Sequence, residues 1–259
     1  MTLLLDPARR HVIGHRGNRA HAPEDTLESF AQAAALGVDA LELDLHLSKD
    51  GVPVVLHDPT LDRTTDATGP VAALTVAQLA KVDAGARFTP DAGRTTPYRG
   101  TGIAVPTLEE VLLAHPTLPL ILEIKAVEAA RPVLSLLDRL NATARVLVGS
   151  FHDAALVPFA QAGIPIAGAT GALRRLFLPA LLGLPHAPLP FQAMCIPRVF
   201  RGLPLPVRGF TRIMRRAGGP THVWTVNDPA EARMLWSLGV SGIISDDPGA
   251  MLAERSALA

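Results

Sequence analysis

This sequence of 259 residues contains one cysteine and few long apolar runs. More than a quarter of it, in one continuous stretch, contains no acidic side chain. The single cysteine, Cys195, excludes a disulfide within the chain. The longest run without Asp, Glu, Lys or Arg, residues 176–197, contains five prolines, which excludes one membrane-spanning helix. The N-terminus lacks the apolar region of a signal peptide, because Asp6, Arg9 and Arg10 follow its three leucines. We therefore expect a soluble, cytoplasmic protein.

Acidic residues are absent from residues 154–227, which carry eight arginines and no lysine. This stretch has a net charge of +8, while residues 1–153 carry −5 and residues 228–259 carry −3. The total is zero, which argues against nucleic acid as a partner because such binding depends on a large positive excess. With 48% hydrophobic and 19% charged residues, the composition is that of a globular protein.

Short apolar runs alternate with amphipathic segments along the chain. The runs predicted as strands are residues 11–14, 40–47, 118–124, 145–148, 164–168, 191–195, 222–226 and 242–244, and the clearest helix patterns are residues 26–36, 107–114, 130–140, 154–162 and 229–238. Eight alternations in a chain of this length predict an α/β fold, a (β/α)8 barrel in one domain spanning residues 1–259. An open doubly wound sheet is the alternative, but no glycine-rich dinucleotide loop follows the first run. Residues 58–105 are too long for a plain barrel loop.

Two acidic residues occupy one face of the second predicted strand. Residues 41–46 read Leu-Glu-Leu-Asp-Leu-His, and side chains alternate across a strand, so Glu42, Asp44 and His46 share a face. Inside a barrel, two carboxylates are unfavourable unless they are paired or bind a cation. Hard oxygen ligands at this spacing suit Mg²⁺ or Ca²⁺. An amphipathic edge strand with one solvated face is the alternative.

A second acidic strand repeats this pattern. Glu123 and Lys125 lie on one face at the C-terminal end of residues 118–124, the end at which barrel active sites lie. Glu123 could complete a three-carboxylate metal site, and Lys125 could contact an anionic oxygen of the substrate. A local Glu–Lys pair that caps the strand is the alternative.

Histidines follow two of the apolar runs. His15, Arg16 and a glycine come directly after the first run, where Arg16 suits phosphate binding and a histidine suits proton transfer. His57 ends the run 52–56, beyond the strand of Glu42 and Asp44. Two histidines on neighbouring loops, one on each side of a metal-bound phosphate, suit general acid–base cleavage.

Residues 23–26, Pro-Glu-Asp-Thr, are typical of the start of a helix. We interpret the two acidic residues as lying in its first turn, where negative charge is favourable. A structural role at the start of a helix is enough to explain this motif, without any role in function.

Taken together, these motifs resemble those of glycerophosphodiester phosphodiesterases, in order and spacing, over nearly the whole chain. The matching pieces are His15-Arg16-Gly17, Pro23-Glu24-Asp25-Thr26, Glu42-Leu43-Asp44, Lys49-Asp50-Gly51, His57-Asp58, Leu61-Asp62-Arg63-Thr64-Thr65, Pro106-Thr107-Leu108-Glu109-Glu110, Leu122-Glu123-Ile124-Lys125, Trp224-Thr225-Val226-Asn227 and residues 239–248. The resemblance implies a TIM barrel in which residues 58–105 form a small insertion after the second strand. It also implies one divalent metal, Mg²⁺ or Ca²⁺, held by Glu42, Asp44 and Glu123.

The same resemblance implies an activity, the metal-dependent hydrolysis of glycerophosphodiesters to glycerol 3-phosphate and an alcohol. It implies that His15 and His57 are the acid–base pair, with Arg16 and Lys125 near the phosphate. Trp224 would line the mouth and stack on the alcohol or on a choline-like group, although a packing role is an equal alternative.

Residues 170–208 are rich in proline and leucine and follow the fifth predicted strand, which places them at the mouth of the barrel. Six leucines and one phenylalanine lie between residues 173 and 184, beside Arg174 and Arg175. One hypothesis is an apolar lip that binds a lysolipid chain or an anionic membrane surface, as in a lysophospholipase D-type phosphodiesterase located at the membrane periphery. The alternative is a loop and helix that pack on the barrel with both arginines in solvent.

Two other classes of protein remain as alternatives. A non-catalytic barrel could bind phosphorylated ligands, but the complete set of carboxylates and histidines favours an enzyme. A sugar-phosphate isomerase or aldolase would need an enediol base or a Schiff-base lysine, for which Lys125 is the interior candidate. The carboxylates near Lys125 argue against that chemistry.

Overall fold

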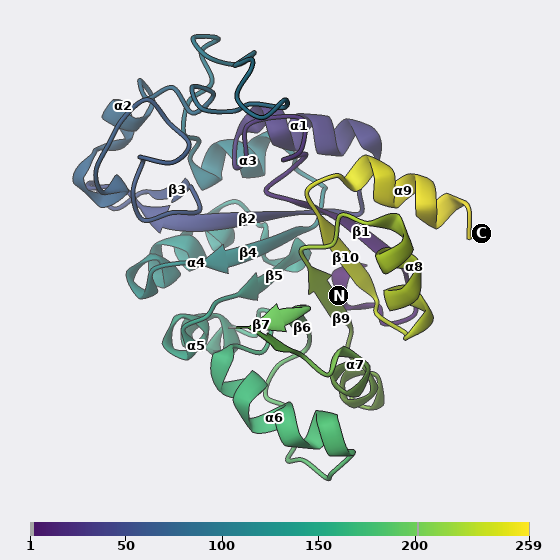
Figure 1. The fold of residues 1–259 in the computed structure, drawn as a ribbon. Helices are drawn as coiled ribbons and strands as arrows, with labels where there is room; N and C mark the ends of the chain where they lie inside the picture. Colours follow the sequence, from purple (N-terminus) through teal and green to yellow (C-terminus); the bar gives the residue numbers. More distant parts are fainter. Residues whose placement is uncertain (1–2, 201, 259) are drawn as a thin grey trace.

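A ring of parallel strands forms the centre of the computed structural model, which describes residues 3–200 and 202–258 (Figure 1). The strands of the ring are β1 (His11–His15), β2 (Ala40–Leu47), β4 (Leu120–Ile124), β5 (Val146–Gly149), β6 (Met194–Pro197), β9 (Thr221–Trp224) and β10 (Gly242–Ser245). They pair in the order β5-β4-β2-β1-β10-β9-β6. The predicted α/β barrel is therefore confirmed.

The ring closes between β5 and β6 through isolated bridges. Ile166 pairs with Val148 of β5, and Ala167 pairs with Ala193 just before β6. Residues 164–168, predicted as the fifth strand, therefore occupy the expected position but do not form a regular strand. Pro165 has no N–H to donate, which limits the hydrogen bonding of this stretch.

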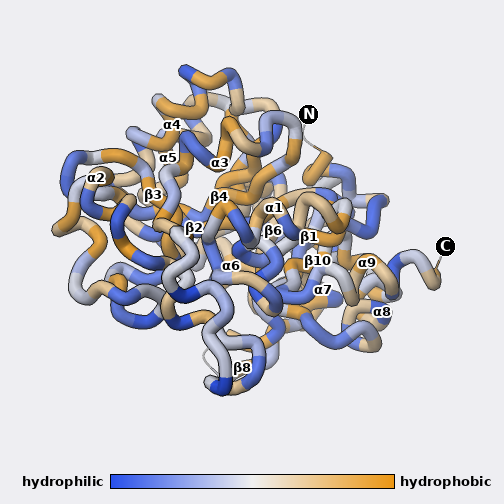
Figure 2. The backbone as a smooth tube through the Cα atoms, turned by 90° about the horizontal axis from the view of Figure 1, so that it is seen from above, coloured by the Kyte–Doolittle hydropathy of each residue, from blue (hydrophilic) through white to orange (hydrophobic). Residues whose placement is uncertain are grey.

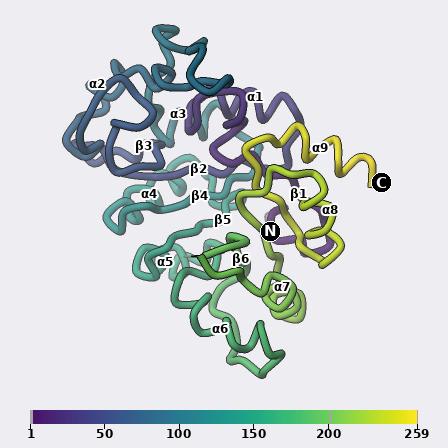
Figure 3. The backbone as a smooth tube through the Cα atoms, viewed as in Figure 1, coloured from purple at the N-terminus to yellow at the C-terminus, as the bar shows by residue number. Residues whose placement is uncertain are grey.

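Helices cover the outside of the ring in chain order, as the colours of Figure 3 show. They are α1 (Leu27–Leu36), α3 (Leu108–Ala114), α4 (Ala130–Arg139), α5 (Asp153–Gln161), α6 (Thr170–Leu182), α7 (Val207–Arg216), α8 (Pro229–Ser237) and α9 (Pro248–Ser256). Local sequence sets several of their starts. Before α3, for example, the Thr107 side chain accepts from the Glu110 N–H, and the Glu110 carboxylate accepts from the Thr107 N–H, a capping box.

The alternation along β2 separates an apolar layer from a polar interior. Leu41, Leu43 and Leu45 are fully buried in the cluster between the strands and the helices. Glu42 and Asp44 point to the other side, into the ring, as the period of two requires. Figure 2 shows apolar segments along the strands and hydrophilic segments at many of the outer loops.

The lower interior of the ring is filled mainly by apolar side chains. Leu4, from the 3-10 helix η1 (Leu3–Leu5), packs there with a second cluster that includes Ile13, Ile121 and Ile244. The Leu4 carbonyl also accepts a hydrogen bond from His222 Nε2 at 3.0 Å. The carboxylate side chains inside the ring lie nearer the C-terminal ends of its strands, on β2 and β4.

The expected insertion follows the second strand of the ring. Strand β3 (Pro53–Val55) pairs antiparallel with β2, and the chain then forms η2 (Val71–Ala73) and the short helix α2 (Val76–Leu79). The insertion has its own apolar cluster, which includes Leu61, Val71 and Leu79. This hairpin carries His57 to the rim of the ring, next to the end of β2.

Residues 170–208 are mostly helix and a short hairpin. Leu173, Leu176 and Ala180 form the buried face of α6. This face therefore packs on the barrel, as the alternative to a lipid-binding lip expected. The hairpin of β7 (Val199–Phe200) and β8 (Leu203–Pro204) precedes α7. In the described ranges, no helix combines the length and the apolar character needed to cross a membrane.

We predict that Leu43→Ala lowers the free energy of unfolding by about 2–5 kcal/mol, because it leaves a cavity between the strands and the helices. The matched control is Leu113→Ala on α3, where the side chain is 62% exposed. It should change the free energy of unfolding by no more than about 0.5 kcal/mol. Urea unfolding followed by circular dichroism measures both, and equal effects would contradict the packing of the leucine face of β2.

Candidate active site

A cavity of about 210 Å³ lies at the C-terminal ends of the strands. Of the eight site residues predicted from the sequence, seven line it, namely His15, Arg16, Glu42, His57, Glu123, Lys125 and Trp224. The eighth, Asp44, is 1% exposed and contacts two of them through ion pairs. The structure therefore brings all eight predicted residues together.

Strand register places the acidic side chains side by side. In the parallel pairing of β2 with β4, Asp44 lies opposite Glu123, and in that of β1 with β2, His15 lies opposite Glu42. Ligand oxygens of Glu42, Asp44 and Glu123 all lie within 4.8 Å of one another. We call these three residues the carboxylate cluster.

Burial and mutual repulsion dominate the electrostatics of the carboxylate cluster. Burial, reinforced by the charge of Asp44, raises the pKa of both Glu42 and Glu123. Burial acts in the same direction on Asp44, but the Lys125 ammonium and the Arg16 guanidinium outweigh it and lower the pKa of Asp44. Three buried carboxylates, two of which resist ionisation, are a hard-oxygen donor set that fits Mg²⁺ or Ca²⁺.

Two cations flank the carboxylate cluster. Arg16 Nε lies 2.9 Å from Asp44 Oδ2, and Lys125 Nζ lies 2.9 Å from both Asp44 Oδ1 and Glu123 Oε1. The Glu–Lys pair considered as an alternative is thus present, but it also reaches Asp44. Burial alone would lower the pKa of Arg16 and of Lys125, but the surrounding carboxylates outweigh burial and raise both pKa values, so both side chains stay charged. Both cations line the cavity and can bind an anionic group.

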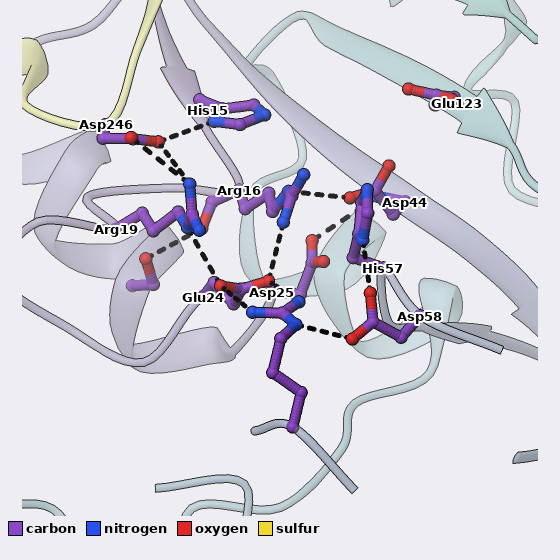
Figure 4. A network of polar contacts seen from close by, with 12 residues as sticks. His15, Arg16, Arg19, Glu24, Asp25, Asp44, His57, Asp58, Glu123 and Asp246 are labelled. Atoms are coloured by element: carbon purple, nitrogen blue, oxygen red, sulfur yellow. Dashed lines mark hydrogen bonds and ion pairs between the residues drawn. The ribbon is translucent and has the colours of Figure 1, made fainter. Parts of the chain in front are cut away.

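Each predicted catalytic histidine is held by an aspartate at Nδ1. The distance is 2.6 Å from His15 Nδ1 to Asp246 Oδ1 and 2.6 Å from His57 Nδ1 to Asp58 Oδ1. Because a carboxylate accepts, Nδ1 carries the proton in both rings, and Nε2 is the atom available for proton exchange in the neutral form. Figure 4 shows the two rings on either side of the Arg16–Asp44 ion pair.

The aspartate of the first pair, Asp246, was not among the predicted site residues. It directly follows β10, and it also accepts from Asn227 Nδ2 at 2.9 Å. Burial alone would raise the pKa of Asp246, but the hydrogen bond from His15 outweighs burial and lowers this pKa to about 2. The position of Asp246 at a strand's C-terminal end is the same signal that pointed to Glu123 and could have found it.

Residues 23–26 lead into a helix as predicted, but the placement of Glu24 and Asp25 in its first turn is wrong. Helix α1 begins at Leu27 with Thr26 as its N-cap, so Glu24 and Asp25 precede it. Asp25 has a φ of 58°, is 2% exposed and accepts from the Asp44 N–H at 3.4 Å. Glu24 accepts from Arg16 Nη1 at 2.7 Å. The left-handed turn at Asp25 directs both side chains toward the site, which propensity alone does not predict.

Apolar residues line the rest of the cavity. They include Phe151, Leu173, Pro197 and Trp224, and the rings of Phe151 and Trp224 meet edge to face with their centroids 6.0 Å apart. Trp224 therefore lies at the expected position, and its contact with a ligand stays a prediction. A polar and an apolar half of one cavity suit a ligand with an anionic and a less polar part.

A TIM barrel with acidic residues, cations and paired histidines at its strand ends has the composition of a phosphate-ester hydrolase site. The model of the glycerophosphoryl diester phosphodiesterase family matches residues 15–161 and 181–250. The chain belongs to this family, as its motifs indicated.

Named relatives agree over most of their length. The chain is 31% identical to a glycerophosphodiester phosphodiesterase of Caldanaerobacter subterraneus, over 93% of this chain and 96% of the relative. It is 31% identical to the probable glycerophosphodiester phosphodiesterase 2 of Mycobacterium tuberculosis, over 92% and 87%.

Solved structures agree with the fold. The glycerophosphoryl diester phosphodiesterase domain of an uncharacterized M. tuberculosis protein superposes with a TM-score of 0.84 at 26% identity, covering 95% of this chain and 99% of that one. A phosphodiesterase of Oleispira antarctica, solved with the product sn-glycerol-3-phosphate, has a TM-score of 0.76 at 26% identity, covering 96% and 97%.

We predict that Glu42→Gln raises the melting temperature of the metal-free protein at pH 8 and has little effect near pH 4. The folded-state pKa of Glu42 is raised, so its ionisation destabilises the fold only as the pH rises above the unfolded value of about 4.3. Thermal unfolding in chelator across this range measures the effect. Glu28→Gln, at an exposed position on α1, is the control. A lower melting temperature for Glu42→Gln at pH 8 would contradict the repulsion within the carboxylate cluster.

Proposed function

We propose that the protein hydrolyses glycerophosphodiesters to glycerol 3-phosphate and an alcohol, with one divalent metal and two catalytic histidines. The observation that carries this proposal is the placement of the carboxylate cluster, two cations and two aspartate-held histidines around one cavity. The names of the relatives and the product bound to the Oleispira enzyme support the same substrate class.

Glu42, Asp44 and Glu123 would hold the metal. When bound, a divalent metal supplies positive charge that stabilises the negative charge developing on the phosphate in the transition state. Arg16 and Lys125 would bind non-bridging phosphate oxygens, for which a planar guanidinium and a mobile ammonium are both suited. These cations would also turn the phosphate so that the scissile bond faces the histidines.

His15 and His57 would carry out the two proton transfers. Nε2 of one ring would remove the proton from the nucleophile, and Nε2 of the other would give a proton to the leaving alkoxide. If water is the nucleophile, this step yields glycerol 3-phosphate and the alcohol directly. If a glycerol hydroxyl is the nucleophile, the step yields a cyclic phosphodiester and the alcohol, and a water molecule then opens the ring to give glycerol 3-phosphate. Asp246 and Asp58 accept from Nδ1–H, which leaves Nε2 as the atom through which each ring takes up or gives a proton. Burial, together with Lys125 and Arg16, lowers the pKa of His57, which favours its neutral form.

The apolar half of the cavity would receive the leaving alcohol. Phe151 and Trp224 present ring surfaces there, and a choline-like cation can stack on an indole face. Leu173 and Pro197 extend this wall toward α6 and the hairpin.

We predict that His57→Gln reduces kcat for glycerophosphocholine about 10²- to 10⁴-fold, because general acid–base catalysis contributes a factor of that size. The melting temperature should stay within about 2 °C, because a change in stability below about 0.5 kcal/mol shifts it by no more than this. Release of glycerol 3-phosphate is assayed with Mg²⁺, Ca²⁺, Mn²⁺ or chelator.

His186→Gln, in an exposed loop after α6, is the matched control for this assay. It should retain wild-type activity. Near-normal turnover of His57→Gln, or wild-type turnover that chelator does not reduce, would contradict the proposed mechanism.

A second candidate function, a lysophospholipase D-type activity at a membrane surface, is favoured by the outer faces of α6 and α7. Leu178, Leu181, Leu182 and Leu184 are 48–63% exposed at the end of α6. Arg174 and Arg175 are exposed on the same helix, and Arg208, Arg212, Arg215 and Arg216 are exposed on α7. Helices α6 and α7 lie side by side, with Gly209 packed against the Ala180 backbone.

The charge of this surface is not balanced locally. In residues 3–200 and 202–258, none of these six arginines forms an ion pair with a carboxylate. Arginines attract anionic headgroups, and exposed leucines can enter the interfacial region of a bilayer. Thr170 and Leu173, at the other end of α6, line the cavity, so a lysolipid could extend from the cavity along this helix.

We predict that the wild-type protein pellets with vesicles containing phosphatidylglycerol and cleaves lysophosphatidylcholine faster than glycerophosphocholine. Replacing Leu178, Leu181 and Leu182 together by Gln should remove pelleting, because it removes the apolar contribution to binding. Leu113→Gln, on α3, is the control. If neither pelleting nor a preference for the lysolipid is observed, this second candidate is wrong and the first stands.

A further inference from the structure

A chain of charged side chains begins at His15 and leads away from the cavity. His15 donates to Asp246, and Arg19 Nη1 lies 3.2 Å and 3.3 Å from the two oxygens of the same carboxylate. Arg19 Nε in turn donates to Glu24 Oε2 at 2.9 Å. The first histidine is therefore connected to Glu24 through one aspartate and one arginine.

The second histidine is connected to the same glutamate from the other side. His57 donates to Asp58 Oδ1, and Arg63 Nε donates to Asp58 Oδ2 at 2.5 Å. Arg63 also donates through Nη2 and Nη1 to the two oxygens of Glu24, at 2.7 Å and 2.9 Å. Figure 4 shows this network as a continuous series of contacts that runs from Asp246 through Glu24 to Asp58.

We call Arg19, Glu24 and Arg63 the arginine bridge. Positive and negative groups alternate along it, so every carboxylate has a cationic neighbour. The Glu24 side chain is 10% exposed. Burial alone would raise the pKa of Glu24, but its arginine neighbours outweigh burial and hold this pKa well below the usual range. Charge-assisted hydrogen bonds of this kind, centred on the buried Glu24 carboxylate, favour one position for each partner.

The bridge joins parts of the chain that are far apart in sequence. Glu24 lies in the loop after β1, Asp246 follows β10, and Arg63 belongs to the insertion after β3. Arg63 is 44% exposed, so it is not needed to fill the core. What it does is attach the insertion, and with it His57, to the loop of the first strand.

We propose that the arginine bridge is a positioning device that holds His15 and His57 in matched orientations for the two proton transfers of one catalytic cycle. This proposal rests on the acid–base roles proposed for the two histidines. The bridge residues do not touch the substrate in this account, and they act through Asp246 and Asp58.

Arg63 is the best residue with which to test this, because a change at Glu24 would also release Arg16. Arg63→Met keeps the length of the side chain and removes the forked hydrogen bonds. Loss of a residue that orients a catalytic group typically costs about 10- to 100-fold in activity. We predict a fall of that size in kcat for glycerophosphocholine, with KM and metal affinity within about twofold of the wild type, because binding does not use the bridge.

Two variants serve as comparisons. Arg63→Lys, which restores one charged donor, should recover part of kcat. Arg87→Met, in the same insertion, removes a hydrogen bond to the Thr65 carbonyl but no bridge contact, and should behave as the wild type. The melting temperatures of all three should agree within about 2 °C, since exposed positions contribute little to stability.

A double variant tests whether the bridge acts as one unit. If it does, Arg19→Met combined with Arg63→Met should be little worse than the more severe single variant, because one break already disconnects the histidines. If the two arginines support their aspartates independently, the losses in kcat will multiply. Multiplied losses would therefore overturn the proposal of a shared bridge.

A measurement without turnover separates this inference from the proposed function. In ¹⁵N NMR spectra of the histidine rings, the neutral His57 of the wild type should show one tautomer with the proton on Nδ1. Arg63→Met should give a mixture of tautomers, while Arg87→Met should not. An unchanged His57 tautomer together with unchanged kcat would overturn the positioning role. A wild type that is inactive on phosphodiesters but shows the tautomer change would instead reject the function and keep the bridge.

Discussion

The crowding of three carboxylates at the C-terminal ends of two neighbouring strands is the constraint on which the rest of the site depends. Glu42, Asp44 and Glu123 are brought together by strand register, and burial makes their combined charge unfavourable. Arg16 and Lys125 reduce this cost by pairing with Asp44. Such a crowded set of carboxylate oxygens is suited to a compact divalent cation that prefers hard oxygen ligands.

Further charged side chains extend from this centre to the rim of the barrel. Arg16 pairs with Glu24, which belongs to the arginine bridge between the two histidine–aspartate pairs. The insertion therefore contributes more than His57, because Arg63 attaches it to the loop after β1. Catalytic geometry that depends on two distant loops needs such a connection, since loops are otherwise the more mobile parts of a barrel.

Most of the barrel, and the grouping of the eight candidate site residues around one cavity, could be predicted from the sequence. Period-two patterns such as residues 41–46 fix which side chains face inward. The stretch 164–168 was less predictable, since its pairing depends on Val148 and Ala193, far away in the chain. Glu24 and Asp25 looked like helix-start residues, and only the left-handed turn at Asp25 turns them toward the site. Contacts such as that of Arg63 with Glu24 join residues 39 positions apart, which local patterns do not reveal.

We propose that Glu42, Asp44 and Glu123 together bind one catalytic divalent metal. Anomalous diffraction from crystals of the protein grown with Mn²⁺ tests it most directly, because the signal locates the ion without reference to activity. We expect one strong anomalous peak among the oxygens of these three carboxylates, and its loss in Glu42→Gln. A peak at other residues, or none at a Mn²⁺ concentration that supports full turnover, would contradict it.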